Sequence, residues 1–142
     1  NAFETALACI SAESNPEEFA MLSNNLGNAL QYADEEHALA NNVRALEAYD
    51  AALAIRRRSG ESLSLANTLA NRANCIARLP DAPVRPECRK PGNLVEAIAN
   101  AGEARSIFSK FGEQERSGMM TALIVDLEAE LAREGANGYC TG

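Results

Sequence analysis

A repeat is the feature of this sequence that most limits how it can fold. The motif Asn-x-x-Asn-x-Leu at residues 25–30 returns 46 residues later, at 71–76, as Asn-x-x-Asn-x-Ile. A second motif, aromatic-x-x-Ala-Leu, occurs at 3–7 and again at 49–53 with the same offset. Two motifs that alternate with one spacing predict a two-helix unit that is used several times, as in a solenoid.

The composition favours helices over strands. Only 5% of the residues are aromatic, Trp is absent, and 46% are hydrophobic, with Ala abundant among them. Val and Ile do not alternate with polar residues, so no strand is predicted. We therefore expect an all-α protein in which residues 1–142 form a single domain.

Apolar spacing, capping signals and glycines predict six helices. The start at 15–18, Asn-Pro-Glu-Glu, offers a capping Asn and a Pro at the first helical position. Gly60 and Gly112 are placed to end helices in a left-handed conformation. An acidic connector at 34–41, helical at most at its end, separates the second helix from the third. The predicted helices lie near 2–12, 16–33, 42–58, 62–79, 93–110 and 113–134.

A proline-rich segment interrupts the pattern. Pro80, Pro83, Pro86 and Pro91 fall within twelve residues, so we expect residues 80–92 to lie outside the regular helices. Asn-Leu-Val-Glu at 93–96 then resembles a capping box that starts the fifth helix.

The repeated motifs resemble tetratricopeptide repeats. Residues 25–30, Asn-Leu-Gly-Asn-x-Leu, are similar to the first helix of such a unit, and residues 45–53 are similar to the second. The resemblance implies that Gly27 packs against Ala45, since small side chains let two helices approach closely. It implies the same role for four further alanines: Ala52, Ala73, Ala97 and Ala104.

The closest resemblance is to long bacterial tetratricopeptide arrays similar to kinesin light chain repeats, and it covers nearly the whole chain. It implies a right-handed superhelical solenoid of about six antiparallel helices, here a fragment of a longer protein. The sequence departs from the family in its spacing, which is about 34 residues in the family, and in Arg72, which stands where Leu is usual. HEAT-type repeats have a nearer period, about 40–47 residues, but the Gly/Ala/Ala spacing favours tetratricopeptide repeats.

Charge and cysteine usage exclude several kinds of partner. The formal charge of −7 argues against nucleic acid and anionic membranes, and no apolar stretch reaches the roughly 18 residues of a membrane span. No two cysteines form a Cys-x-x-Cys pair, so we expect no metal site. Cys9 and Cys75 occupy apolar helix positions, whereas a disulfide of Cys88 or Cys140 is left open. We expect a reducing cytoplasm.

Nothing in the sequence predicts catalysis or a cofactor. His37 is the only histidine and lies in the acidic connector, and no Gly-rich phosphate loop is present. The run Arg56-Arg57-Arg58 at a helix end is best explained by the helix dipole and by salt bridges with Glu47, Asp50 or Glu61.

The asparagines are the candidate binding residues. Three of them lie along one strip of the second helix: Asn24, Asn25 and Asn28. Three more lie along the fourth helix at i, i+4 and i+7: Asn67, Asn71 and Asn74. Asn is a mediocre helix former, so this repetition has a cost, and its amide suits the backbone of an extended peptide. The alternative is a ladder of asparagines that only joins the repeats. The predicted groove residues are Asn24, Asn28, Asn67, Asn71 and Asn74, followed by Met119 and Leu123 at an apolar end.

The sequence thus predicts a non-catalytic module that binds an extended segment of another protein, or of its own parent chain, in a concave groove. Two alternatives stay open. The first is a scaffold that forms homo-oligomers through exposed repeat ends. The second is a regulatory repeat domain of a larger signalling or protease protein.

Overall fold

The computed structural model describes residue 4 and residues 13–31, 38–79 and 91–136. These residues are all-helical and contain no strand, as the sequence predicts. The predicted helix at 2–12 and most of the proline-rich segment lie outside the described residues. The helices are α2 (Pro16–Gln31), α3 (Ala38–Arg58), α4 (Leu63–Ala77), α5 (Pro91–Lys110) and α6 (Gln114–Ala136).

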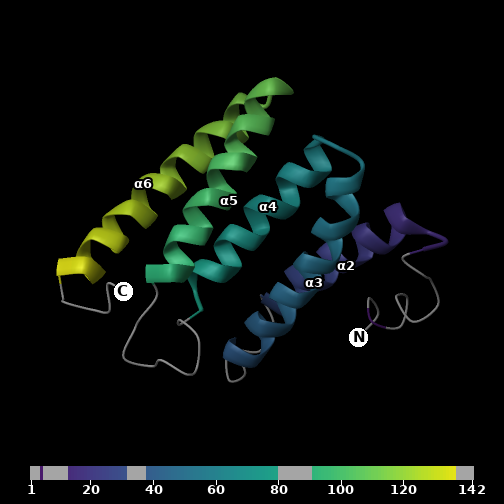
Figure 1. Ribbon diagram of the computed structural model, residues 1–142, viewed down its shortest axis with the longest axis horizontal. Coiled ribbons are helices and arrows are strands. Elements are labelled where there is room, and N and C mark those ends of the chain that lie inside the picture. The colour runs from purple at the N-terminus through teal and green to yellow at the C-terminus, as the bar shows by residue number, and fades with distance from the viewer. Residues whose placement is uncertain (1–3, 5–12, 32–37, 80–90, 137–142) are drawn as a thin grey trace.

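Consecutive helices pack against each other in chain order, and α2 also touches α4 (Figure 1). Gly60, with φ of 84°, and Gly112, with φ of 76°, follow α3 and α5 in the predicted left-handed conformation. Ser62 caps α4, since its Oγ accepts a hydrogen bond of 3.1 Å from the backbone N–H of Leu65. None of the helices in the described ranges is long and apolar enough to cross a membrane.

The prediction of a capping box at residues 93–96 is wrong. The helix begins at Pro91, so Pro91 and Gly92 are helical and Asn93 already lies in the first turn. Proline suits this position because the first helical N–H has no partner within the helix. The Asn93 side chain instead donates a hydrogen bond of 2.8 Å to the carbonyl of Leu79, which ties α5 to the chain just after α4.

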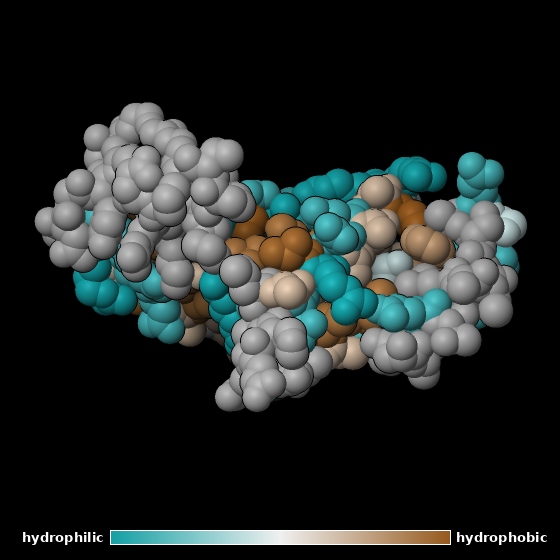
Figure 2. All heavy atoms as spheres, turned by 90° about the horizontal axis from the view of Figure 1, so that it is seen from below, coloured by the Kyte–Doolittle hydropathy of each residue, from teal (hydrophilic) through white to brown (hydrophobic). Residues whose placement is uncertain are grey.

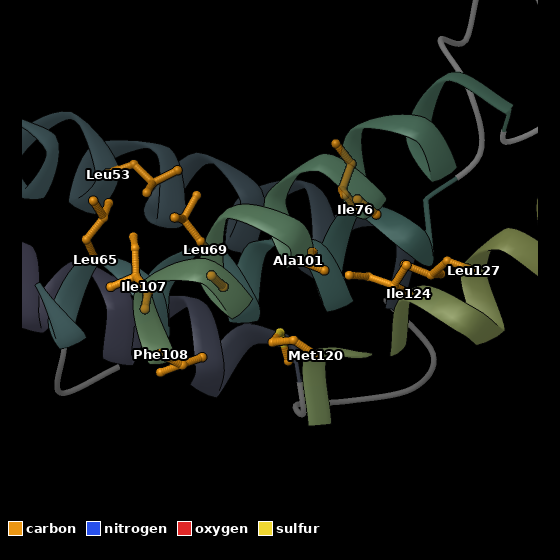
Figure 3. Close-up of a cluster of buried hydrophobic side chains, with 14 of the residues drawn as sticks. Leu53, Leu65, Leu69, Ile76, Ala101, Ile107, Phe108, Met120, Ile124 and Leu127 are labelled. Atoms are coloured by element: carbon orange, nitrogen blue, oxygen red, sulfur yellow. The ribbon is translucent and has the colours of Figure 1, made fainter. Parts of the chain in front are cut away.

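The largest core lies between α4, α5 and α6 (Figure 3). Leu69, Leu94 and Phe108 are its largest fully buried members. Ala73, Ala97 and Ala104 are completely buried in the same cluster. Their small side chains allow the close helix approach that the resemblance implies at these positions.

The nearest neighbour of Gly27 is a side chain that the sequence does not predict. A Cβ at Gly27 would lie 2.6 Å from Cε1 of Tyr49, so the fully buried Tyr49 ring lies directly on the bare backbone of α2. Ala45, one turn earlier on α3, is also fully buried, in a cluster with Leu30, Tyr49 and Cys75. The small residue was identified correctly, but the sequence does not reveal which α3 side chain fills the space.

Two arginines form ion pairs between helices that the sequence does not predict. Arg72 on α4 donates from Nε to Asp50 on α3 at 2.7 Å and from Nη1 to Glu96 on α5 at 2.8 Å. Burial alone would lower the pKa of Arg72, but its hydrogen bonds to Asp50 and Glu96 outweigh that effect and raise it. Arg57 binds both carboxylate oxygens of Glu103, at 2.8 and 3.0 Å.

The predicted partners of Arg56–Arg58 are therefore wrong. Asp50 is bound by Arg72, and Glu61 is bound by Lys110 through both carboxylate oxygens. Cys75 does behave as the predicted buried thiol. Its Sγ lies 3.3 Å from the carbonyl of Asn42, and burial raises the pKa of the thiol to about 11.

Replacing Gly27 with Ala tests the contact with Tyr49. Alanine is the better helix former, yet its Cβ would overlap the ring, so we expect a net loss of about 1–3 kcal/mol in the free energy of unfolding. Gly102 on α5 is the control, because a Cβ there meets no atom within 4 Å. Gly102→Ala should gain about 0.5–1 kcal/mol. Equal gains for both variants in urea unfolding would contradict the contact.

Candidate binding groove

All five predicted asparagines line one pocket of about 390 Å³. We call this pocket the groove. Met119 lines it as predicted, whereas Leu123 is absent from its lining and packs, partly buried, against the α4–α6 core. The sequence predicts Leu123 in the groove because Leu123, like Met119, takes a place in the repeat that matches the asparagines. The lining residues are Asn24, Asn28, Asn67, Ala70, Asn71, Asn74, Phe108, Arg116, Met119 and Met120.

A chain of hydrogen bonds reaches the groove from the interior. Arg56 on α3 donates from Nη1 to Oγ1 of Thr68 on α4, and the Thr68 hydroxyl donates to Oδ1 of Asn24 on α2 at 3.1 Å. The same oxygen accepts a second bond, of 3.2 Å, from Nδ2 of Asn71. Two donors of α4 thus meet on one amide oxygen of α2, and Arg56 of α3 lies one bond behind them. We call this chain of hydrogen bonds the Arg56 relay.

Arg56 is the unexpected member of this relay. The sequence suggests a surface charge at a helix end, but the residue is only 9% exposed and also donates to the carbonyl of Ser64 at 3.0 Å. Burial lowers the pKa of its guanidinium, and the charge of Glu17 partly offsets the effect. Its buried Nε has no hydrogen-bond partner among the described residues. The guanidinium of Arg56 is therefore held mainly through Nη1, by Thr68 and Ser64.

A second buried hydroxyl, that of Tyr49, forms a hydrogen bond with Asn28. The Tyr49 hydroxyl donates to Oδ1 of Asn28 at 2.6 Å and accepts from Nε2 of Gln31 at 3.0 Å. Gln31, the last residue of α2, is 9% exposed and does not line the groove. The ring that fills the space at Gly27 therefore also orients the neighbouring asparagine.

Two of the three groove asparagines of α4 are bound by their nitrogens. Nδ2 of Asn74 donates to the carbonyl of Ala70 at 3.2 Å, and Nδ2 of Asn71 donates to Asn24. Asn67 accepts a long bond, 3.4 Å, from Nη1 of Arg116. One end of each groove asparagine is thus bound by the protein. No hydrogen bond reaches the other end within the described ranges.

These contacts support part of each sequence hypothesis. The bond between Asn24 and Asn71 joins two helices, as an asparagine ladder would. The remaining polar atoms of the same side chains stay available to a ligand in the groove, because they carry no internal bond in the described part of the chain. An amide that is fixed at one end and open at the other is suited to bind without reorganisation.

Arg116 is the groove residue that sequence reasoning missed. Its guanidinium lies 5.9 Å from the centroid of the Phe108 ring, and it has no carboxylate partner among the described residues. Its spacing could have identified it, since residue 116 precedes Met119 and Met120 by three and four positions and so shares their helix face. The groove thus ends in a positive charge beside thioether and aromatic surface.

The lining combines hydrogen-bonding groups with apolar surface. Its side chains offer amides, one guanidinium, two thioethers and a phenyl ring. The described ranges contain no group of three or more His, Cys, Asp or Glu residues that could hold a metal ion. His37, Cys9, Cys88 and Cys140 lie outside the described residues. Comparison of the chain with protein-family models, with curated proteins and with solved structures found no match.

Replacing Thr68 with Val tests the Arg56 relay. Valine keeps the shape of this fully buried residue but removes the hydroxyl, so Arg56 loses an acceptor and Asn24 a donor. We expect a cost of about 1–3 kcal/mol in urea unfolding. The same change at Thr121, an exposed residue that bonds within its own helix, should stay within about 0.5 kcal/mol of the wild type. A Thr68→Val variant as stable as the wild type would disprove the relay.

Proposed function

We propose that this chain is a tetratricopeptide-like helical repeat module that binds an extended segment of another protein, or of its own parent chain, in the groove. The observation that carries the proposal is the convergence of five asparagine amides from α2 and α4 on one pocket. Each amide has an end that no described residue occupies. An extended peptide carries one N–H and one C=O at nearly every residue, and asparagine can pair with both.

The repeat organisation supports the same proposal. Adjacent α2 and α4 carry the two copies of the asparagine motif, and both copies line the groove. In a right-handed solenoid of such units, the first helix of every repeat lies on the concave side. We propose this arrangement for the chain, with α2, α4 and α6 as the inner helices. The groove volume is also in the range of about 300–1,000 Å³ that is usual for ligand pockets.

The far end of the groove indicates what side chains the segment carries. Met119 and Met120 are flexible and polarizable, so they adapt to an apolar side chain. Arg116 lies beside them without a carboxylate partner in the described ranges, and no acidic residue lines the groove. Although the whole chain has a formal charge of −7, the groove therefore favours a segment in which a carboxylate adjoins an apolar residue.

The test begins with ten-residue peptides selected from a random display library on the wild-type chain. Asn74→Ala removes one polar contact, and Met119→Ala removes apolar surface. Each should weaken binding of the selected peptide about two- to tenfold in fluorescence anisotropy. Val125→Ala is the control, since Val125 is as exposed as Met119, at 60% against 59%, lies on the same helix and does not line the groove. Full affinity in both groove variants would place peptide binding elsewhere.

Self-association is the second candidate function. Val95 is 55% exposed, Phe111 50% and Val125 60%, and all three belong to the α5–α6 region outside the groove. Hydrophobic residues also reach the surface between hydrophilic ones on the face shown in Figure 2. Exposed apolar surface of this kind favours association with a second copy.

Sedimentation equilibrium separates the two candidates. Self-association predicts a mass that rises with concentration above 15.2 kDa and returns to the monomer value in Val125→Glu. A monomer at every concentration would remove this candidate and leave the peptide-binding proposal untouched.

A further inference from the structure

The asparagines of α2 and two of the three on α4 are bound by opposite ends. On α2, the bound atoms are oxygens, because Oδ1 of Asn24 accepts from Thr68 and Oδ1 of Asn28 accepts from Tyr49. On α4, Nδ2 of Asn71 donates to Asn24 and Nδ2 of Asn74 donates to a backbone carbonyl, whereas Asn67 is bound by its oxygen, through Arg116 of α6. The open ends are therefore nitrogens at Asn24 and Asn28 and oxygens at Asn71 and Asn74.

The chemistry of the relay explains why the Asn24 amide has this orientation. A guanidinium has five donors and no acceptor, so Arg56 can only donate to Thr68. The Thr68 hydroxyl has a single proton, and with its oxygen engaged by Arg56 it gives that proton to Asn24. Asn24 meets this donor with its oxygen, which leaves its NH₂ group as the open end.

Asn28 is oriented in the same manner by a different hydroxyl. Tyr49 accepts a hydrogen bond from Nε2 of Gln31 and so gives its own proton to Asn28. The two asparagines of α2 thus present hydrogen-bond donors for a shared reason. In each case a buried hydroxyl accepts one bond from inside the protein and donates its single proton to the asparagine.

We propose that the groove has walls of opposite hydrogen-bonding polarity, a donor wall of Asn24 and Asn28 on α2 and an acceptor wall of Asn71 and Asn74 on α4. Between them it binds a peptide unit whose C=O faces α2 and whose N–H faces α4. The ligand part of this inference rests on the function proposed above. A trans peptide unit matches the arrangement because its C=O and N–H point in opposite directions. In an extended chain successive units alternate, so every second unit fits.

Arg56 is the positioning residue of this site. It touches no ligand and does not line the groove. Through Thr68 it fixes which end of Asn24 the groove presents, and Asn24 in turn holds Asn71 through the same oxygen. A charge in the interior thereby orients one asparagine on each wall, Asn24 and Asn71.

Asn→Asp substitutions test the polarity without any ligand. A carboxylate keeps the oxygen of the amide and replaces its NH₂ group with a second acceptor. Asn24→Asp and Asn28→Asp retain their bonds from Thr68 and Tyr49, so their melting temperatures should equal or exceed that of the wild type. Asn71→Asp and Asn74→Asp lose their donors and place a carboxylate against another oxygen. Their melting temperatures should fall by about 3–6 °C or more.

The four variants form matched pairs. Asn28 and Asn74 each lie three residues before the end of their helix, at Gln31 and Ala77, so the unfavourable effect of the helix dipole on a new negative charge is the same in both. All four changes add one negative charge. Equal destabilisation of the two pairs, greater destabilisation of the α2 pair, or failure of Asn24→Asp to fold would overturn the proposal.

Binding of the display-selected peptide tests the direction of docking. Asn24→Asp replaces a donor with an acceptor that faces the peptide carbonyl, so its affinity should fall about tenfold or more while its melting temperature holds. Unchanged affinity in this folded variant would overturn the proposed direction. If no peptide can be selected, the proposed function fails, and the melting pattern of the four variants still decides the polarity of the walls.

Discussion

The contact between Tyr49 and the bare backbone of Gly27 is the one on which the rest of the structure depends. Without a Cβ at residue 27, the Tyr49 ring can lie against the backbone of α2, and its hydroxyl bonds to Asn28 and Gln31. Farther along α3, Arg56 lies beside Thr68 of α4. Helix α3 thus carries both the hydroxyl that bonds to Asn28 and the arginine whose relay reaches Asn24.

The interior and the groove are joined by polar rather than apolar contacts. Buried polar groups are costly unless every partner is present, and then they specify one arrangement. Arg56 illustrates both effects, since burial lowers the pKa of its guanidinium while its bonds to Ser64 and Thr68 hold α3 against α4. Asparagine is a poor helix former, and the internal hydrogen bonds of these side chains offset that cost. Groove polarity and fold stability therefore share the same residues.

The sequence predicts what depends on spacing along one helix. The helix ends at Gly60 and Gly112, the buried alanines of α4 and α5, and the common strip of the asparagines all follow from periodicity and local backbone chemistry. Contacts between helices depend on rotation and axial shift, which periodicity does not encode. The partner of Gly27, the burial of Arg56 and the exclusion of Leu123 from the groove are of this second kind. Arg116 belongs to both kinds. Its spacing from Met119 can be read from the sequence, but the absence of a carboxylate partner among the described residues cannot.

Neutron diffraction from a deuterium-exchanged crystal tests most directly the central claim that buried hydroxyls fix the polarity of the groove. Nuclear density distinguishes an amide ND₂ group from an oxygen and locates the deuteron of each hydroxyl. The account predicts deuterons on the groove-facing atoms of Asn24 and Asn28, none on those of Asn71 and Asn74, and a Thr68 deuteron directed at Asn24. A Thr68 deuteron directed elsewhere, with the groove-facing atom of Asn24 bare of deuterium, would contradict it.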